Sequence, residues 1–421
     1  MRLKIVIIFL LVTPILALGY PDFEVLVNDN PFQEKMVFSL RDQINGNTFM
    51  TIIEPDLNNK FYIVSQSAGW DFKVNKNYLT FFQKSPPGWY VVNRNMVQVD
   101  FLQSVNGYSA DNHDIQYLDN GGYILQSYVL QPIDLPQTSH IDIVRTLVLQ
   151  EFDHDHNLIM EWNNSDHMSI LDYIDYLNLE AASVPWTHGN SIEIDYDENI
   201  IISNRAMNEV VKFDRISGDI IWILGGPNNF FSFVGDPYNG PLMQHDARRL
   251  ENGNIMIFDN GSTLGENSRP SRVTEYIIDE INLSATLIWE YFHPEEFVAV
   301  NQGSAQKLEN ENILINWGTV TGNGAIITEV TPDKEVVLDL RFPENINTYK
   351  VRKKNWSFNQ GIMKADINND SKINIIDVII AVGVVLDGPS DYFFDIYKLD
   401  LNQDGKVNIS DLLAIVNIIV M

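Results

Sequence analysis

The sequence has no cysteine among its 421 residues. This absence excludes a disulfide framework, a zinc site with thiolate ligands, a cysteine nucleophile and a lipoprotein anchor. Basic residues are also scarce, with 28 Lys and Arg against 56 Asp and Glu and a formal net charge of -28. Because nucleic acids attract positively charged surfaces, this balance argues against nucleic acid as a partner. The surplus of carboxylates suits bound cations instead.

Long apolar runs are missing as well. Beyond the N-terminus no stretch reaches the roughly 20 apolar residues that a membrane helix needs, so we expect no membrane span. Residues 1–19 place Arg2 and Lys4 before a short apolar run that ends at the small-residue segment Ala17-Leu18-Gly19. That order is typical of a secretory signal peptide. We therefore predict a secreted protein, located outside the cell, on its surface or in the periplasm.

Most of the chain lacks helical periodicity. From Pro21 to Phe342, short β-branched and aromatic runs alternate with Asn, Gly and Asp turns, which is typical of an all-β fold. A sequence pattern of two strand fragments joined by a polar turn, which predicts a hairpin, recurs at 118–125, 250–257 and 308–315. Repeated four-stranded units of this length predict the blades of a β-propeller over residues 20–343. One helical insertion is expected at 169–180.

The C-terminal segment has a different composition. We predict a linker over 344–361 and a second domain over 362–421, in which the segments 366–377 and 400–411 align position by position. Each segment places oxygen donors at loop positions 1, 3, 5, 9 and 12 and a backbone carbonyl at position 7, the wrapped spacing that Ca²⁺ needs. The predicted ligands of the two calcium sites are Asp366, Asn368, Asp370, Lys372, Asn374 and Asp377, and Asp400, Asn402, Asp404, Lys406, Asn408 and Asp411.

Each calcium loop is followed by one apolar segment, 378–386 or 412–419, which we expect to form a single helix. Ser371 stands at the sharp turn of the first loop where the second has Gly405, so the first site is expected to bind more weakly. Two such loops with one helix apiece resemble dockerin modules. The resemblance implies a small α-helical, calcium-binding dockerin-like domain and a cohesin-like protein as its candidate partner.

Three of the eight histidines share one kind of position. His113 and His245 each stand just before a blade turn and His188 enters a strand, and all three occupy equivalent places in successive repeats. Equivalent positions at the inner ends of blades converge on the propeller axis, so we expect these imidazoles to lie together, with Arg205 reaching the same space. The cluster suits an oxyanion. Without a cysteine or a serine in a nucleophile elbow, imidazole is the best available nucleophile for a sulfuryl or phosphoryl centre.

Several motifs occur in order between about residues 100 and 340. They are His113-Asp-Ile, His188-Gly-Asn-Ser-Ile, Ser203-Asn-Arg205, Gly218-Asp-Ile-Ile-Trp-Ile-Leu-Gly-Gly226, Gln244-His-Asp-Ala-Arg248, Phe258-Asp-Asn-Gly261 and Gln302-Gly-Ser-Ala-Gln306. Together they resemble the arylsulfotransferase family of six-bladed β-propellers. The resemblance implies that His245 takes the sulfuryl group as a sulfohistidine, while His113, His188 and Arg205 bind the sulfuryl oxygens. It further implies PAPS-independent, ping-pong transfer from an aryl sulfate to a phenolic acceptor, with no nucleotide cofactor.

Other interpretations of the same residues stay open. His245 is a structural histidine bonded to Asp246 or to a blade backbone in one alternative. A second alternative is a non-catalytic secreted propeller that binds sulfated or carboxylated ligands through the cationic axis and docks through its tail. A third is a hydrolytic sulfatase, which releases sulfate without an acceptor. His154 and His156 lie in an acidic hairpin tip and are expected to be solvated rather than to bind metal.

Overall fold

The computed structural model describes residues 20–261, 268–358, 364–368, 372–387, 398–402 and 406–420. The described residues from Pro21 to Phe358 belong to one compact unit, and those from Lys364 to Val420 belong to a second. The predicted signal peptide, residues 1–19, lies outside the described residues. So do six residues of the predicted calcium loops, namely Asn369, Asp370, Ser371, Gln403, Asp404 and Gly405.

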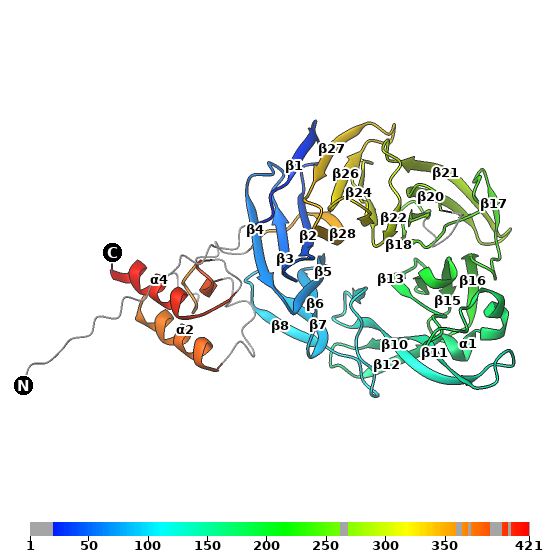
Figure 1. Ribbon diagram of the computed structural model, residues 1–421, viewed down its shortest axis with the longest axis horizontal. Helices are drawn as coiled ribbons and strands as arrows, with labels where there is room; N and C mark the ends of the chain where they lie inside the picture. Colours follow the sequence, from blue (N-terminus) through cyan, green and yellow to red (C-terminus); the bar gives the residue numbers. More distant parts are fainter. Residues whose placement is uncertain are drawn as a thin grey trace, which may run out of the picture. The chain divides into compact units, whose positions relative to one another are not determined.

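The larger unit is a six-bladed β-propeller, as the sequence predicts (Figure 1). Blade 1 contains β28 (Ile346–Lys354), β2 (Lys35–Asp42), β3 (Thr48–Ile53) and β4 (Lys60–Ser65). Blade 2 contains β5 (Ala68–Asn75), β6 (Tyr78–Lys84), β7 (Pro87–Val92) and β8 (Gln98–Leu102). Blade 3 contains β9 (Ile115–Tyr117), β10 (Tyr123–Asp134), β11 (Ile141–Phe152) and β12 (Leu158–Asn163).

The other three blades follow the same antiparallel order. Blade 4 contains β13 (Gly189–Ile194), β14 (Ile200–Asn204), β15 (Glu209–Phe213) and β16 (Ile220–Gly225). Blade 5 contains β18 (His245–Arg249), β19 (Ile255–Asp259), β20 (Arg272–Asp279) and β21 (Ser284–Phe292), with β17 (Ser232–Val234) parallel to β21. Blade 6 contains β23 (Ser304–Lys307), β24 (Ile313–Asn316), β26 (Ile326–Val330) and β27 (Val336–Arg341). A separate two-stranded sheet pairs β22 (Ala299–Asn301) with β25 (Thr319–Val320).

The propeller is closed by strands from both ends of the unit. β28 supplies the first strand of blade 1 and pairs with β2, and β1 (Glu24–Asn28) adds to the outer edge of blade 6 beside β27. The predicted linker over 344–361 is therefore wrong for 346–354, which is a strand of the propeller. The prediction failed because this strand is rich in lysine, and its Lys353 is buried in an ion pair with Glu329 that the sequence does not reveal.

The cores lie between neighbouring blades. One cluster packs Ile201 and Trp222 of blade 4 against Ile257 and Tyr276 of blade 5, and all four side chains are buried. Burying a large apolar side chain contributes about 1.5 to 3 kcal/mol, so such clusters hold the blades in a fixed order. The first strands of adjacent blades also contact one another, as β13 does with β9 and β18. This contact brings the strand ends that carry the histidines together.

An insertion between blades 3 and 4 carries the segment in which a helix over 169–180 was expected. It contains α1 (Asn164–His167), followed by a 3-10 helix, η1 (Ile170–Tyr176), which is shorter than the expected helix and takes its place. The two buried side chains of η1, Ile170 and Tyr173, are three residues apart, the spacing that aligns side chains on a 3-10 helix. A second short 3-10 helix, η2 (Arg205–Met207), follows β14.

The second unit contains the helices that the sequence predicts after each loop. They are α2 (Ile375–Asp387) and α4 (Ile409–Val420), and they pack against each other. Their small core includes Ile367, Ala381, Leu399 and Ile415.

Candidate active site

The three predicted histidines lie at the entrances of adjacent inner strands. His113 stands just before β9, His188 directly precedes β13, and His245 is the first residue of β18. The ring centroids of His113 and His188 are 4.7 Å apart. The side chain of Tyr128, from β10, lies against both, at 5.9 Å from His113 and 5.8 Å from His188. The structure therefore brings together residues more than 70 positions apart in sequence, as the repeat pattern predicts.

A β-bulge positions His245. The register of β18 against β19 shifts between His245 and Arg248, and Asp246 has a left-handed backbone with φ of 56°. A bulge breaks the simple alternation of side chains and re-aims them. Asp246 consequently accepts hydrogen bonds from Arg248 and Arg352 rather than from His245. The structure thus gives no support to a structural His245 held by Asp246, whereas a backbone N–H, that of Gln302, does bond to the ring, as the other form of that alternative expects.

The hydrogen bonds of His245 define its tautomer. The backbone N–H of Gln302 donates to His245 Nε2 at 3.2 Å, so this nitrogen carries a lone pair and no proton. His245 Nδ1 lies 2.8 Å from Asn260 Oδ1. Asn260 Nδ2 donates to the carbonyl oxygens of Ala299 and Gln302, which fixes Oδ1 as the acceptor that faces the ring. The proton of His245 is therefore on Nδ1, and Nε2 is the nucleophilic atom.

Gln302 is brought to His245 by an unusual turn. Its φ is 61°, and the following Gly303 has φ of 108°, a conformation that favours glycine. A Cβ on Gly303 would lie 2.3 Å from the Phe258 ring, so the turn packs tightly against β19. The motif that begins at Gln302 therefore has a structural role that the sequence did not define, because its backbone rather than its side chain meets the nucleophile.

The ionisation of His245 suits a nucleophile. Its side chain is buried, and burial together with the positive charge of Arg205 lowers the pKa of His245 to about 3. The bond to Asn260 opposes this shift without reversing it. Burial, followed by the neighbouring imidazoles and Arg205, also holds the pKa of His188 well below its ordinary value. Both rings are therefore neutral near pH 7.

His113 is held by a carboxylate. Its Nδ1 lies 2.6 Å from Asp111 Oδ1, which also accepts hydrogen bonds from the backbone N–H of His113 and from Gln126 Nε2. Burial raises the pKa of Asp111, but His113 and Gln126 outweigh that effect and leave the pKa below its usual value. Asp111 is thus ionised and orients His113 with Nδ1 toward itself, which leaves Nε2 to face the site.

Two guanidinium groups flank His188. Arg205 donates from its backbone N–H to the carbonyl oxygen of His188 at 2.9 Å, and its Nη2 donates to the carbonyl oxygen of Val300 at 3.1 Å. Arg145, from β11, donates from Nε to the carbonyl oxygen of Thr187 at 3.1 Å. Arg205 was predicted from its motif, whereas Arg145 was missed, because it lies in the middle of an apolar strand with no motif around it.

A layer of ion pairs is built from the residues that follow the histidines in sequence. Asp114 accepts from Arg248 Nη2 at 2.6 Å and pairs with Lys73. Asp246 accepts from Arg248 Nε at 2.9 Å and from Arg352 Nη2 at 2.6 Å. Both carboxylates are fully buried. Each His-Asp pair therefore gives one residue to the imidazole cluster and the next to a network that joins the blades.

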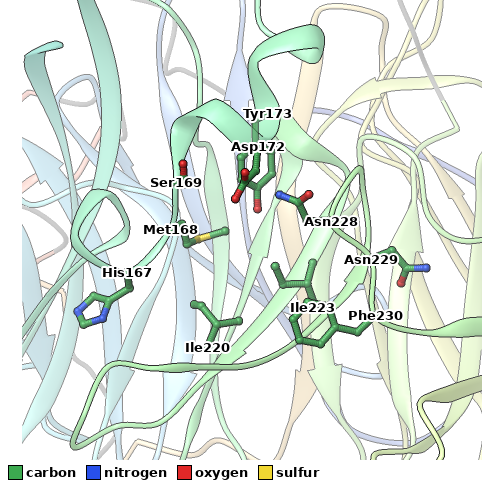
Figure 2. Close-up of a pocket in the computed structure, with 10 residues that line it drawn as sticks. All are labelled: His167, Met168, Ser169, Asp172, Tyr173, Ile220, Ile223, Asn228, Asn229 and Phe230. Atoms are coloured by element: carbon green, nitrogen blue, oxygen red, sulfur yellow. The ribbon is translucent and has the colours of Figure 1, made fainter. Parts of the chain in front are cut away.

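A pocket of about 420 Å³ lies outside this cluster (Figure 2). It is formed between the insertion, which contributes Met168 and Tyr173, and the outer edge of blade 4, which contributes Ile220 and Phe230. None of the four predicted catalytic residues lines it. We therefore place the candidate active site at the histidines and not at this pocket.

The two C-terminal loops share one hydrogen-bond pattern. Asp377 accepts from the backbone N–H groups of Ile367 at 2.8 Å and Asn374 at 2.8 Å. Asp411 accepts from the equivalent Leu401 at 2.9 Å and Asn408 at 3.0 Å. In each loop, therefore, the last predicted ligand reaches back to the loop's beginning and closes it. Asp366, Asp377, Asp400 and Asp411 are all buried, as the inward-facing ligands of a calcium loop would be.

Two other features are absent from the described residues. No helix in the described ranges is long and apolar enough to cross a membrane. Within the same ranges, no three His, Asp or Glu side chains are grouped closely enough to hold a metal ion. Two members of the predicted calcium ligand sets, Asp370 and Asp404, lie outside those ranges.

Comparison with known families identifies the larger unit. The sequence model of the arylsulfotransferase (ASST) family matches residues 27–353, which include strands of all six blades. The chain belongs to the arylsulfotransferase family. The match includes all four predicted catalytic residues and Arg145, and it ends before the C-terminal unit. No curated protein sequence matches this arylsulfotransferase-family chain significantly.

Solved structures are similar in architecture and distant in sequence. A protein of unknown function from Bacteroides caccae is 9% identical with a TM-score of 0.47, covering 76% of this chain and 98% of its own. A virginiamycin B lyase from Staphylococcus aureus is 9% identical with a TM-score of 0.40, covering 77% of this chain and 89% of its own.

Proposed function

We propose that this propeller is an aryl-sulfate sulfotransferase that uses His245 as its nucleophile and needs no nucleotide sulfate donor. Membership of the arylsulfotransferase family supports sulfotransferase activity in general. The observation that carries the mechanism is the state of His245, whose neutral ring presents an unprotonated Nε2 beside His113, His188 and Arg205. A donor-rich, partly buried site around a neutral imidazole is the arrangement that covalent transfer of an oxyanion group requires.

The reaction has two balanced halves. In the first, the Nε2 lone pair of His245 attacks the sulfur of an aryl sulfate, an N–S bond forms, and the S–O bond to the aryl group breaks. The leaving phenolate takes a proton from the site or from water. In the second, the oxygen of a phenolic acceptor, losing its proton, attacks the same sulfur and the N–S bond breaks. The net reaction exchanges one phenol for another on the sulfuryl group and consumes no cofactor.

The surrounding residues have assigned roles in this proposal. Arg205 neutralises the sulfuryl oxygens and His188 hydrogen-bonds to them, so that charge in the transition state meets fixed donors. His113 joins them as a donor when its Nε2 is protonated as well as the Nδ1 that faces Asp111. Asn260 keeps the proton of His245 on Nδ1. The Gln302 N–H, which donates to Nε2 in the structure, gives up this bond when sulfur approaches and then faces a sulfuryl oxygen.

The decisive experiment is capture of the covalent intermediate. Incubation with 4-nitrophenyl sulfate and no acceptor should add one sulfuryl group to the protein, and peptide mass spectrometry should place it on His245. His245→Ala should abolish both the label and the transfer to phenol. If a broad set of phenols is never sulfated by the wild type and no label is found, the catalytic proposal is wrong.

One alternative has support of its own. The cationic cluster would also hold an anionic, sulfated ligand without reacting, as a secreted binding propeller would. Tight binding of an aryl sulfate with neither label nor phenol release would favour this function. Release of inorganic sulfate in the absence of an acceptor would instead indicate a hydrolytic sulfatase.

We further propose that the second unit is a calcium-dependent docking module on an exported protein. The duplicated closure of the loops by Asp377 and Asp411, and the one helix after each, support two Ca²⁺ sites. Each of the two ions would be held by one set of six ligands predicted from the sequence, and both would supply folding free energy to the module. A cohesin-like protein is the proposed partner. Export and the partner are each testable by fractionation of the source cells and by calcium-dependent pull-down with a cohesin domain.

A further inference from the structure

The guanidinium of Arg145 is fixed at the edge of the candidate active site. Its Nε donates to the carbonyl oxygen of Thr187 at 3.1 Å, and Thr187 Oγ1 donates back to the carbonyl oxygen of Arg145 at 3.2 Å. Its Cζ lies 5.4 Å from the ring centroid of Tyr128, the aromatic side chain that also contacts both His113 and His188. These contacts engage Nε and leave the two terminal nitrogens available at a partly exposed position.

Arg145 and Arg205 bond to different backbone carbonyl groups around His188. Arg205 bonds to the carbonyl oxygen of His188 and to that of Val300, in the segment that leads to Gln302 and the nucleophile. Arg145 instead bonds to Thr187, on the preceding side of His188. Arg205 is thus held beside the segment that leads to the nucleophile, and Arg145 is held beside Tyr128, at the edge of the site that His113 and His188 form.

The two arginines differ from the other basic residues at the axis. Arg248 and Arg352 each form ion pairs with buried carboxylates. For Arg145 and Arg205, the described residues provide carbonyl oxygens but no carboxylate within ion-pair distance. Their mutual repulsion acts with burial to lower the pKa of Arg205. Adjacent cations without counter-charges are costly for folding, and clusters of this kind are typical of anion-binding sites.

The transferring group of an aryl sulfate carries a single negative charge, which Arg205 and the imidazole donors already serve. A substrate whose only anionic group is the sulfate therefore leaves Arg145 without an anionic partner. A carboxylate is the planar group that a guanidinium fork binds with two parallel hydrogen bonds. Tyr128 contacts both Arg145 and the imidazoles and so adds an aromatic side chain to this edge of the site.

We propose that Arg145 binds a carboxylate on the aromatic ring of the substrate, so that the site selects aryl sulfates and phenols that carry an acidic group. This substrate class rests on the proposed function of the same site. It assigns Arg145 to specificity and leaves the chemistry with His245.

The test compares two non-reactive ligands, 4-sulfobenzoate and benzenesulfonate, which share a sulfonate and differ by one carboxylate. Isothermal calorimetry on the full chain should show wild-type protein binding 4-sulfobenzoate about 10- to 100-fold more tightly, the range expected for a charge-assisted hydrogen-bonded pair. Arg145→Gln should remove this preference and leave benzenesulfonate binding within about threefold of wild type. Arg145→Lys should keep part of it, because the charge stays and the fork is lost. Lys354→Gln, an exposed substitution at the end of β28, controls for net charge.

Equal binding of the two ligands by the wild type, or an equal loss of both in Arg145→Gln, would overturn the inference. Circular dichroism of each variant separates a lost contact from a lost fold, and Arg145→Lys provides a second variant should Arg145→Gln fail to fold. The readout does not depend on catalysis. A preference for 4-sulfobenzoate without any sulfohistidine would refute the transferase and keep the carboxylate site. Labelled His245 with no preference would keep the transferase and refute the carboxylate site.

Discussion

Replacing Asn260 by aspartate tests the tautomer on which the mechanism depends. The Asn260→Asp change keeps an oxygen acceptor opposite His245 Nδ1, where the present distance is 2.8 Å, and removes the two hydrogen bonds from Asn260 Nδ2 to Ala299 and Gln302. It also places a negative charge beside a ring that the surrounding positive charges keep neutral.

The expected effect is a raised pKa of His245. In the wild type, burial and Arg205 hold that pKa at about 3, so the ring stays neutral throughout the range in which the protein is assayed. An opposite charge within about 4 Å typically shifts a pKa by roughly 1 to 3 units toward the charged form. The pKa of His245 in Asn260→Asp should therefore lie at about 4 to 6. Only the neutral ring can attack, so the rate of sulfohistidine formation should fall about tenfold per pH unit below that value.

The assay is single-turnover release of 4-nitrophenol. Reactions are run at pH values between 4 and 8 and quenched, and the product is measured after the samples are made alkaline. The wild type should show no loss from His245 in this range, whereas Asn260→Asp should lose rate on the acid side. Asn58→Asp, in the exposed turn between β3 and β4, adds the same charge away from the site and should follow the wild type. A flat profile for Asn260→Asp would mean that residue 260 does not face Nδ1, and the assignment of the lone pair to Nε2 would be refuted.

The same bond predicts a different result for Asn260→Ala. Without an acceptor, the buried Nδ1–H is left unsatisfied at a cost of about 1 to 3 kcal/mol. This cost favours the other tautomer, which turns the lone pair away from the substrate. The population of the reactive ring should fall by roughly 5- to 150-fold, because each 1.4 kcal/mol is a factor of ten. The loss should be the same at every pH, in contrast to the profile of the aspartate variant.

Three further outcomes follow from the structure. Burial raises the pKa of Glu209 to about 8, so the stability that comes from its protonation is lost as pH rises from about 4.5 to 8. Glu209→Gln should therefore raise the free energy of unfolding, measured by urea denaturation, by about 3 kcal/mol or more at pH 8.5 and change it little at pH 4.5. The pKa of His245 is lowered by folding, so its contribution to stability falls as pH drops below about 6.5. In His245→Gln the urea midpoint should therefore vary less with pH between 6.5 and 4 than it does in the wild type. Chelation of Ca²⁺ should unfold residues 364–420, measured by hydrogen exchange, and leave aryl sulfate transfer intact; loss of transfer on chelation would place calcium in the catalytic unit.

The sequence predicted the propeller because its hairpins repeat. Polar turns at regular positions and alternating apolar strands are local signals, and the structure places strands on both sides of each of them. The closing strand was missed because its evidence is not local. β28 carries buried lysines, and a buried lysine is recognisable only when its partner is known. Glu329, the partner of Lys353, lies in another blade.

The site shows the same division. His113, His188 and His245 were predicted from their equivalent places in successive repeats, and Arg205 from its motif. Asn260 stands in a quoted motif but was given no role, and Arg145 was missed, since each acts through a partner brought close by the fold. Asn260 meets His245 across two strands of one blade, and Arg145 meets Thr187 across the insertion. No spacing of residues in the sequence predicts the contact between either pair.

The His-Asp pairs at 113–114 and 245–246 show how the propeller combines reactivity with rigidity. In both, the histidine faces the candidate site and the aspartate joins the network around Arg248. Breaking one partner of a buried, shared ion pair usually costs several kcal/mol, so these aspartates fix the strands whose first residues must converge. Rigid strands matter here because a neutral His245 forms no ion pair that would fix its position beside the cationic Arg205. Its position depends on backbone geometry, namely the bulge of β18 and the turn at Gln302, and on the single amide of Asn260. Substitutions in that frame should therefore reduce transfer by displacing Nε2, even where no residue that touches the substrate is altered.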